Sequence, residues 1–403
     1  MTRRRAAPDD FEPWDLNEQF LSAQRGFDPS GLITTRRRLL AGAGLAAAAM
    51  RRPNFALASS EAVEINRLVE KTVSRMSLTE LLGQMFMFQA VGVEMASDFR
   101  AALGDARPGG IIFFGENIGT DDQLRGFIND IHNSIHPLPP LIAIDEEGGP
   151  VVRLPNDPAP GAVELGLMKN KDVRAFGKER AQYLARFGFD VNFAPVADIA
   201  YQADSVMVSR SFGSDPKTVS DKVSATVAGS IAGGVLTAAK HYPGHGRTSV
   251  DSHDTVPIVD ISKSEWLKSD ATPFKAAIKS GVDMIMVGHL DFTQWDAEPT
   301  SLSRIAMDTL RNDLGFKGVI VTDDLGMGAL ATMDPVDLLH RAASGGADLL
   351  LYIAAMDSWT TMIAELESYV RAGHMSSNRL KANVKRIVRL KYTHFKLAER
   401  AKG

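Results

Sequence analysis

Residues 141–149 read Leu-Ile-Ala-Ile-Asp-Glu-Glu-Gly-Gly, and this stretch decides the fold class of the chain. Four apolar residues follow one another without a break and end abruptly in acidic residues and glycines. A short continuous apolar run is typical of a strand buried on both faces, as the strands of parallel sheets are. The polar residues that follow then lie at the carboxyl end of the strand, where parallel α/β folds build their functional sites.

Seven further runs of this kind are spread along the chain and alternate with helix-like stretches. Eight strand–helix alternations within about 340 residues suit a (β/α)8 barrel better than a doubly wound sheet. We therefore predict an α/β fold, a (β/α)8 TIM barrel that forms a single catalytic domain over residues 59–403. The strands predicted besides 141–145 are Gln84–Gln89, Gly110–Phe114, Val191–Val196, Val235–Lys240, Asp283–Gly288, Val319–Thr322 and Asp348–Tyr352.

Helical patterns fill the segments between the predicted strands. Asp215 followed by Pro216 is a favourable helix start, because aspartate caps the first turn and proline fits its first position. The last long helical region, Asp357–Ala398, is expected to close and cover the barrel. The other predicted helices are Asp172–Phe187, Asp215–Gly233, Ser262–Ser280 and Met307–Leu314.

The composition excludes several classes of site. The chain of 403 residues contains no cysteine, which rules out disulfides, thiolate metal ligands and a cysteine nucleophile. Its net charge of -4 argues against a general nucleic-acid-binding protein. We expect a monomer with no cofactor, no bound metal, no nucleic-acid partner and no stable membrane insertion.

Residues 1–58 are interpreted as a targeting segment, and the fold prediction does not include them. Residues 1–33 lack periodicity and are predicted to be unstructured. Thr35-Arg36-Arg37-Arg38 precedes an uncharged run from Leu39 to Met50, which is too short to span a bilayer but suits a signal sequence. This pattern resembles a twin-arginine export signal with cleavage after Ala58, and it predicts a periplasmic or secreted protein. The alternative is an alanine-rich helix in a cytoplasmic protein.

Ionisable residues gather at the ends of four predicted strands. A lone aspartate after a strand often only caps the next helix, and Asp324 is the candidate for that role. Four such strand ends on one rim of a barrel favour an active site instead. The residues concerned are Asp145, Lys240-His241 with the following Asp251-Ser252-His253, His289, and Asp323-Asp324.

These residue types allow two kinds of chemistry. A carboxylate and a separate acid/base could flank a glycosidic bond. Alternatively, a metal-dependent barrel hydrolase would hold its ion with histidines and carboxylates. The first predicted strand carries no histidine and most candidate ligands lie on one loop, which disfavours the metal site. The candidate ligands would be His241, His245, Asp251 and His253.

Four motifs add to this interpretation. Lys-His-Tyr-Pro-Gly-His-Gly at 240–246 runs on to Asp251-Ser252-His253 and Pro257, and the other motifs are Ile144–Gly149 with Arg153, Arg210-Ser211-Phe212-Gly213, and Val321-Thr322-Asp323-Asp324-Leu325. Together they resemble family 3 glycoside hydrolases of the bacterial single-domain β-N-acetylglucosaminidase type. The resemblance covers about residues 65–395, with the motifs in the expected order on the expected strands.

The resemblance implies a retaining β-N-acetylhexosaminidase that hydrolyses terminal non-reducing β-linked GlcNAc through a covalent glycosyl-enzyme. It implies that Asp323 is the nucleophile and His253 the general acid/base, with Asp251 orienting the imidazole. The expected substrates are carbohydrates, namely peptidoglycan fragments (muropeptides) in peptidoglycan turnover, with chitin oligomers as the alternative. The residues that would grip the sugar are Asp145, Arg153, Arg210, Lys240 and His241.

The chain departs from the family pattern in two places. The family often has Asp-Gln-Glu-Gly-Gly where this chain has Asp145-Glu146-Glu147-Gly148-Gly149. The usual Asn-Pro-Val-Ile-Gly is replaced by the stretch Asp204–Ser209, which puts the sugar-binding loop in question but not the reaction. A β-glucosidase or a phosphorylase of the same family stays open as an alternative.

The residue types also suit this reaction on chemical grounds. Imidazole can give a proton and take one back near neutral pH, and a carboxylate hydrogen-bonded to the ring fixes its tautomer. Asp251 and His253 are two residues apart, so they point the same way in an extended segment. Gly244 and Gly246 predict that their loop moves when substrate binds.

Overall fold

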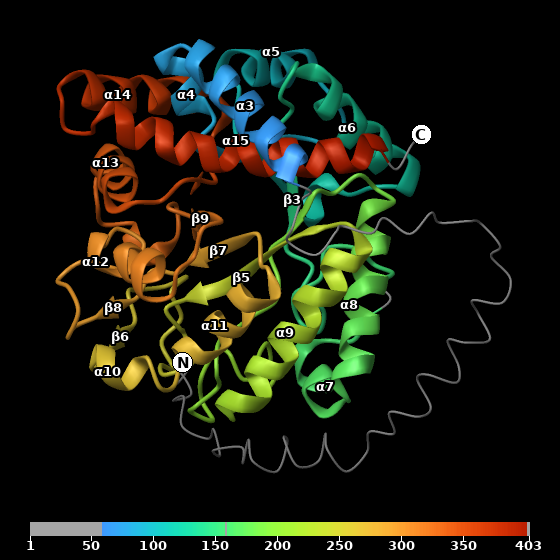
Figure 1. Ribbon diagram of the computed structural model, residues 1–403, viewed down its shortest axis with the longest axis vertical. Coiled ribbons are helices and arrows are strands. Elements are labelled where there is room, and N and C mark those ends of the chain that lie inside the picture. Colours follow the sequence, from blue (N-terminus) through green and yellow to red (C-terminus); the bar gives the residue numbers. More distant parts are fainter. Residues whose placement is uncertain (1–58, 158, 401–403) are drawn as a thin grey trace, which may run out of the picture. The chain divides into compact units, whose positions relative to one another are not determined.

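The eight predicted strands all form, and they pair in parallel in the order in which they follow along the chain (Figure 1). The computed structural model describes residues 59–400 apart from residue 158, so the predictions for residues 1–58 lie outside the described residues. The barrel strands are β1 (Phe86–Gln89), β2 (Gly110–Phe113), β3 (Leu141–Ile144), β4 (Val191–Asn192), β5 (Leu236–Tyr242), β7 (Met284–Val287), β9 (Val319–Thr322) and β10 (Leu350–Leu351). Two further short strands, β6 (Ile258–Val259) and β8 (Asp291–Phe292), pair only with each other.

The sheet closes on itself. Strand β10 pairs with β1, with Leu350 opposite Phe86. On the other side, β10 meets β9 through a parallel bridge between Val321 and Leu349, and the N–H of Thr322 donates to the Leu349 carbonyl at 3.0 Å. The predicted (β/α)8 barrel is confirmed.

Strand β4 is shorter than the predicted run Val191–Val196. The ladder stops at Asn192, and the chain touches β5 again only through a single bridge between Val196 and Lys240. Pro195 lies in this gap and has no N–H to contribute to a ladder. The apolar run therefore overestimates the strand while marking its position correctly.

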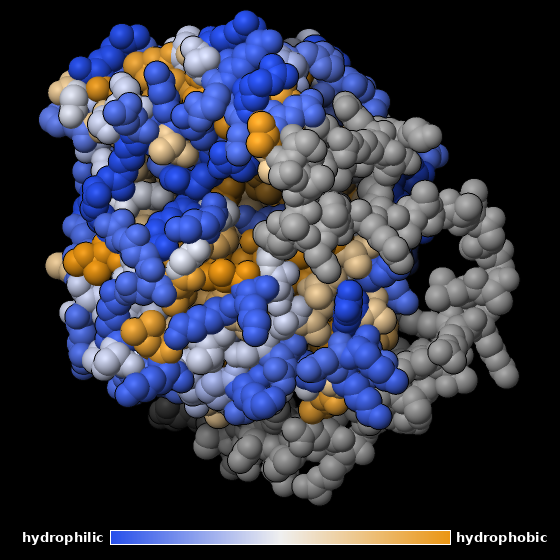
Figure 2. Space-filling model, in the orientation of Figure 1, coloured by the Kyte–Doolittle hydropathy of each residue, from blue (hydrophilic) through white to orange (hydrophobic). Residues whose placement is uncertain are grey.

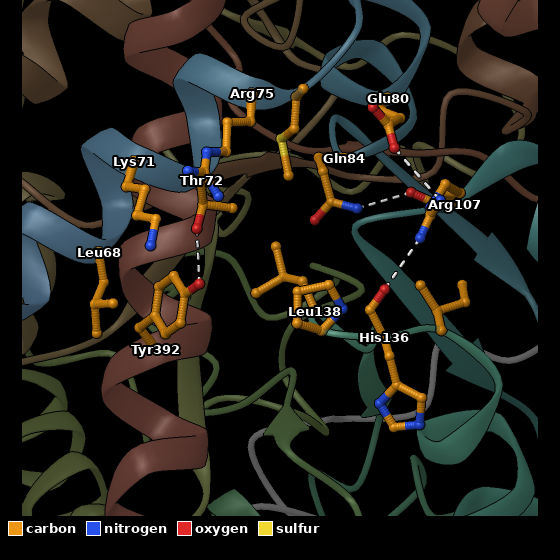
Figure 3. A pocket seen from close by; sticks show the side chains of 13 residues that line it. Leu68, Lys71, Thr72, Arg75, Glu80, Gln84, Arg107, His136, Leu138 and Tyr392 are labelled. Carbon is orange, nitrogen blue, oxygen red and sulfur yellow. Dashed lines mark hydrogen bonds and ion pairs between the residues drawn. The ribbon is translucent and has the colours of Figure 1, made fainter.

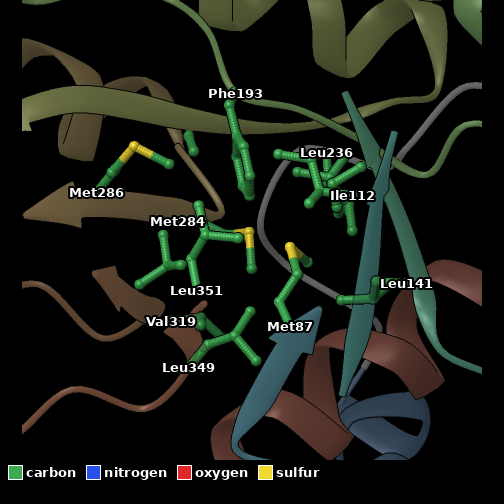
Figure 4. Packing of buried hydrophobic residues seen from close by; sticks show 14 of the residues in the cluster. Met87, Ile112, Leu141, Phe193, Leu236, Met284, Met286, Val319, Leu349 and Leu351 are labelled. Atoms are coloured by element: carbon green, nitrogen blue, oxygen red, sulfur yellow. The ribbon is translucent and has the colours of Figure 1, made fainter. Parts of the chain in front are cut away.

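Alternate residues of the strands fill the interior of the barrel (Figure 4). Successive side chains of a strand point to opposite faces, so every second residue enters the core. On β7, for example, Met284 and Met286 belong to this core cluster, and on β9 Val319 and Val321 do. Ile387, which lies on the last helix of the chain, joins the same cluster.

The helices surround the barrel. Two of them match their predictions, α8 (Asn170–Ala185) and α9 (Pro216–Gly233), and the Asp215 side chain caps α9 by accepting the N–H of Thr218. The helices that were not predicted individually are α3 (Ser59–Arg75), α4 (Leu78–Gly83), α5 (Ser97–Ala106), η2 (Gly115–Asn117), α6 (Asp121–Ser134), α7 (Ala162–Leu167), η4 (Gly328–Leu330) and α13 (Pro335–Gly345).

Three predicted helices are divided. Ser262–Ser280 forms α10 (Lys263–Trp266) and α11 (Ala271–Ser280), because Pro273 is tolerated only in the first turn of a helix. Met307–Leu314 is covered by α12 (Arg304–Asp308) and the π-helical turn η3 (Thr309–Asp313). The region Asp357–Ala398 forms η5 (Met356–Ser358), α14 (Trp359–Arg371) and α15 (Ser377–Arg400), with Gly373 in a left-handed conformation (φ 84°) between the two long helices.

Helix α15 lies across the amino-terminal end of the barrel, as the sequence predicted for the last helical region (Figure 1). The Lys391 ammonium group donates to Gln84 Oε1, just ahead of β1, at 2.7 Å. His394 Nε2 and Asp190 Oδ1, just ahead of β4, are 2.7 Å apart. A cavity of about 380 Å³ lies between α3 and α15, where the hydroxyls of Thr72 and Tyr392 are hydrogen-bonded (Figure 3). This cavity lies at the end of the barrel opposite the predicted catalytic residues.

The face in Figure 2 carries hydrophilic residues with small apolar groups between them. Within residues 59–400, no helix combines the length and the apolar character needed to cross a membrane.

Candidate active site

A network of charged residues forms at the carboxyl ends of β3 and β5. The ammonium group of Lys240, on β5, lies 2.6 Å from Asp145 Oδ1 and 2.7 Å from Glu147 Oε1. Arg210 binds Glu147 with two hydrogen bonds, from Nε to Oε2 at 3.0 Å and from Nη2 to Oε1 at 2.7 Å. Burial alone would raise the pKa of Glu147, but Lys240 and Arg210 lower it to about 2. Three of the predicted sugar-binding residues therefore meet around one ionised carboxylate.

His241 joins this network with a defined tautomer. Its Nδ1 lies 2.7 Å from Asp198 Oδ2, and its Nε2 lies 3.3 Å from Arg210 Nη2. Since a carboxylate accepts and a guanidinium donates, the hydrogen bonds place the proton of a neutral ring on Nδ1. Asp198 is fully buried and also accepts the backbone N–H groups of His241 and His245. Burial raises the pKa of Asp198, but the nearby histidines outweigh burial and lower it.

Asp323 directly follows β9 and is partly buried. Its N–H donates to the Val287 carbonyl of β7 at 2.8 Å, and its Oδ1 accepts the N–H of Asp324 at 2.9 Å. Burial raises the pKa of the Asp323 carboxyl, but His241, His289 and Lys240 outweigh it and lower the pKa below its usual value. Asp323 is thus an ionised carboxylate held at a strand end and surrounded by positive or polarisable groups.

Asp251 and His253 form a pair on the loop between β5 and β6. His253 Nδ1 lies 2.7 Å from Asp251 Oδ1, and the His253 N–H donates to the same oxygen at 2.9 Å. The two side chains are 40 % and 66 % exposed, so the pair is accessible from solvent. Donation from Nδ1 leaves Nε2 as the ring atom that can exchange a proton with a ligand.

The loop after β9 holds the Asp251–His253 loop in place. The N–H of Ala329, on η4, donates to the Ser252 carbonyl at 3.2 Å. A Cβ added to Gly328 would lie only 2.1 Å from the His253 carbonyl oxygen, so the two backbones approach closely at this point. The loop that carries Asp323 therefore also positions the loop that carries the pair.

Arg153 lies apart from the network. Its guanidinium stacks over the Phe114 ring, 5.4 Å from the centroid, and its buried Nε has no hydrogen-bond partner among the residues described here. Its backbone N–H donates to Glu146 Oε2 at 2.7 Å. Of the eight predicted site residues, Arg153 has the weakest link to the others.

Two residues at the centre of the network carry no role in the sequence prediction. Glu147 belongs to the motif Ile144–Gly149, and Asp198 belongs to none of the four motifs. A signal for Asp198 exists in the sequence, because it follows the fourth predicted strand just as Asp145 follows the third. The carboxyl ends of neighbouring parallel strands lie at the same rim of a barrel, so both residues face that rim.

His289 and Asp324 are structural partners of the site. His289 Nε2 lies 2.8 Å from the Asp324 carbonyl and its Nδ1 lies 2.7 Å from Ser301 Oγ. Asp324 Oδ1 accepts the N–H groups of Gly326 and Ile353. Asp324 therefore stabilises a turn and links two strand ends, where a helix cap was predicted.

The histidines of the site are paired with carboxylates. His241 is bound to Asp198 and His253 to Asp251, as described above. Over residues 59–400, apart from the uncertain position 158, no three histidine or carboxylate side chains converge as metal ligands would.

Comparison with known proteins identifies the family of the chain. Residues 77–390 match the model of the glycosyl hydrolase family 3 N-terminal domain. A β-hexosaminidase from Thiobacillus denitrificans is 32 % identical over 292 residues, which cover 70 % of this chain and 81 % of that protein. The β-hexosaminidase LpqI from Mycobacterium tuberculosis is 33 % identical over 320 residues, which cover 75 % of this chain and 80 % of that protein.

Solved structures give the same result. A family 3 β-N-acetylglucosaminidase from a Paenibacillus species superposes with a TM-score of 0.77 at 30 % identity, over 79 % of this chain and 63 % of that one. A β-N-acetylhexosaminidase from Beutenbergia cavernae has a TM-score of 0.73 at 26 % identity, over 78 % of this chain and 98 % of that one.

Proposed function

Because the chain belongs to glycosyl hydrolase family 3, we propose that it is a retaining β-N-acetylhexosaminidase that removes terminal non-reducing β-linked GlcNAc. The observation that carries the proposal is the placement of Asp323. It is an ionised carboxylate at a strand end, beside a network of sugar-binding groups and on the same rim as a hydrogen-bonded aspartate–histidine pair.

In the first step, the Asp323 carboxylate attacks the anomeric carbon while the glycosidic C–O bond breaks. His253, protonated on both nitrogens, donates the Nε2 proton to the leaving oxygen. Asp251 accepts from Nδ1 and stabilises the positive charge of the imidazolium. The products of this step are the free aglycone and a sugar bound covalently to Asp323.

In the second step, water attacks the same carbon and the bond to Asp323 breaks. His253 is now neutral and takes the proton from the water through Nε2. The carboxylate and the imidazolium are regenerated, and two inversions give net retention of configuration.

Sugar hydroxyls need both donors and acceptors, and the charged network offers both. Lys240 and Arg210 donate, and Asp145 and Glu147 accept. These groups are already paired with one another, so substrate binding exchanges partners within a preformed arrangement and needs little reorganisation.

The proposal is tested with the p-nitrophenyl β-glycosides of GlcNAc and glucose. We expect nitrophenol release from the GlcNAc compound to exceed release from the glucoside. A slow fluorinated GlcNAc substrate should leave one sugar on the peptide that contains Asp323, as seen by mass spectrometry. Asp323→Asn is the matched variant and should show neither turnover nor adduct. An adduct elsewhere, or full activity of Asp323→Asn, would refute the assignment.

The natural substrate is proposed to be a peptidoglycan fragment in which GlcNAc is linked to anhydro-MurNAc. Rates on such a muropeptide and on chitin oligomers of equal length distinguish the two sources of GlcNAc. Adding inorganic phosphate to the assay and measuring GlcNAc 1-phosphate tests whether phosphate, and not water, is the acceptor.

On the basis of the export pattern at residues 35–58, we also propose that the protein acts outside the cytosol. A monomer is proposed as its oligomeric state. Cell fractionation of the full chain and of an Arg36→Lys, Arg37→Lys variant tests the export. The variant should stay in the cytosol if the twin-arginine interpretation is right. Light scattering of the purified enzyme tests the oligomeric state.

A further inference from the structure

Glu146 has a fully buried side chain and lies in the sequence between two predicted sugar-binding residues, Asp145 and Arg153. Its Oε2 accepts the N–H groups of Arg153 at 2.7 Å and Leu154 at 3.1 Å. Its backbone is fixed to Asn192 at the end of β4, since its N–H donates to Oδ1 at 3.0 Å and its carbonyl accepts from Nδ2 at 2.9 Å. Glu146 therefore ties both ends of the loop 147–154 to the barrel.

The second carboxyl oxygen of Glu146 lacks such support. Oε1 is buried and has no hydrogen-bond partner within the part of the chain that the structure describes. A buried carboxylate with an unpartnered oxygen is costly, and the neutral acid costs much less. Burial therefore raises the pKa of Glu146 to about 7, against the opposing effect of the two backbone N–H groups.

The charged neighbours do not cancel this effect. Asp157 repels the ionised form of Glu146, and Arg180 on α8 favours it. The Arg180 guanidinium is occupied, because it pairs with Asp157 at 2.7 Å and donates to the Glu147 carbonyl at 2.8 Å. Tyr183, also on α8, is another titratable group that interacts with Glu146.

We propose that Glu146 is a positioning residue that works as the neutral acid, and that its ionisation releases the loop 147–154 and with it Arg153 and Glu147. This inference rests on the proposed function, because it assigns the loop to the sugar-binding site. When the carboxyl is protonated, Oε2 accepts the two N–H groups and no buried charge is present. When the proton leaves, the charge is unbalanced, and movement of the loop toward water relieves it.

Glu146→Gln is the informative variant. The amide oxygen can accept the same two N–H groups, and the amide carries no charge at any pH. On p-nitrophenyl β-GlcNAc, kcat/KM of the variant should match the wild type within about twofold below about pH 6. Above about pH 7, the variant should retain activity that the wild type loses, with the wild-type loss appearing mainly in KM.

Glu146→Ala removes the acceptor altogether and should raise KM at every pH. If the pH profiles of the wild type and Glu146→Gln coincide, the proposal is overturned. It is also overturned if Glu146→Gln is as impaired as Glu146→Ala below about pH 6, because the amide would then fail to replace the neutral acid.

A second measurement does not depend on glycosidase activity. The folded pKa of about 7 lies above the ordinary value of 4.5, so the folded state keeps a proton that the unfolded state loses between these pH values. The wild type should therefore lose stability relative to Glu146→Gln as pH rises through this window, by on the order of 100-fold in the folding constant. A constant difference in urea midpoint from pH 4 to 8 would overturn the proposal even if the enzyme has another substrate. Conversely, a missing hexosaminidase activity with the expected stability change would refute only the proposed function.

Discussion

Asp198 illustrates how a residue without substrate contact can decide what a neighbour does. It holds Nδ1 of His241 and the backbone of two residues, and it is fully buried. This hydrogen bond leaves Nε2 as the ring nitrogen that faces Arg210.

Asp198→Asn keeps the shape but removes the charge and makes the tautomer of His241 ambiguous. Leaving buried partners unsatisfied costs about 1–3 kcal/mol, so kcat/KM should fall roughly 10-fold to 100-fold. Steady-state kinetics on p-nitrophenyl β-GlcNAc measure the loss. Asp130→Asn, at an exposed aspartate on α6, is the control and should be close to wild type. Wild-type kinetics of Asp198→Asn would contradict the positioning role.

His253→Ala should affect substrates according to their leaving groups. A dinitrophenolate can leave without being protonated, whereas the leaving sugar oxygen of a GlcNAc disaccharide needs a proton as the bond breaks. We expect a loss of about 100-fold or more on the disaccharide and a much smaller loss for bond cleavage in the aryl glycoside. Asp254→Ala, on the adjacent exposed residue, should leave both rates unchanged. Equal losses on both substrates would exclude His253 as the acid.

Most of the predicted site residues that the structure brings together lie at the ends of predicted strands. Asp145, Lys240 and His241 belong to this group, and the network also contains Arg210. Glu147 and Asp198 escaped prediction for a physical reason. The position of Asp198 after a predicted strand is visible in the sequence. Its pairing with His241, and that of Glu147 with Lys240 and Arg210, depend on which side chains meet across strands, and local sequence does not show this.

At the scale of elements, close contact between two loops sets the position of the Asp251–His253 pair. Gly328 lies where a Cβ would meet the His253 carbonyl at 2.1 Å, so any larger residue must push the loops apart. Gly328→Ala should therefore lower kcat several-fold while the fold remains intact. Gly126→Ala is the control, because Gly126 lies on α6 with no atom near its would-be Cβ. If Gly328→Ala keeps full activity, the loop contact does not position the pair.

Gly246 shows why loop behaviour is harder to predict than strands. The sequence suggested that Gly244 and Gly246 give the loop mobility, and this stays a prediction. In the structure, a Cβ on Gly246 would lie 1.8 Å from the Ile199 carbonyl oxygen, so its lack of a side chain is required for packing. Glycine serves flexibility and close approach equally well, and only the tertiary contacts distinguish the two.

Strand positions were predicted well because burial on both faces leaves a continuous apolar run. Helix ends were predicted less well. Asp215 and Pro216 marked the start of α9 correctly, whereas the single helix predicted over Ser262–Ser280 is divided ahead of Pro273. Neither signal reports how far apart in space the resulting pieces lie.

At the scale of the whole molecule, the two ends of the barrel differ. The carboxyl ends of the strands carry the candidate active site, and helix α15 covers the amino-terminal end, which is called the sealed end below. Helix α15 closes the sealed end, and it does so with a fully buried lysine as well as with apolar residues. The Lys391 ammonium group donates to Gln84 Oε1 at 2.7 Å. Burial lowers the pKa of Lys391 to about 7, although Asp190 opposes the shift.

This lysine should make stability rise with pH in the alkaline range. The folded pKa of about 7 lies below the ordinary value of 10.5, so between these values the unfolded chain binds a proton that the folded protein does not. Stability of the wild type should therefore increase through this window relative to Lys391→Met, whose side chain cannot titrate.

Relative to the wild type, Lys391→Met should be most stable below about pH 7. As the pH rises toward about 10, the free energy of unfolding of the wild type should increase relative to that of the variant by up to about 3 kcal/mol. Loss of the bond to Gln84 adds an offset that does not depend on pH, so the change with pH is the quantity to measure by urea unfolding. Lys381→Met, on the exposed side of the same helix, should show a small and constant difference. A flat difference for Lys391→Met would mean that the ammonium group stays protonated in the folded barrel, and that the sealed end admits enough water to solvate it.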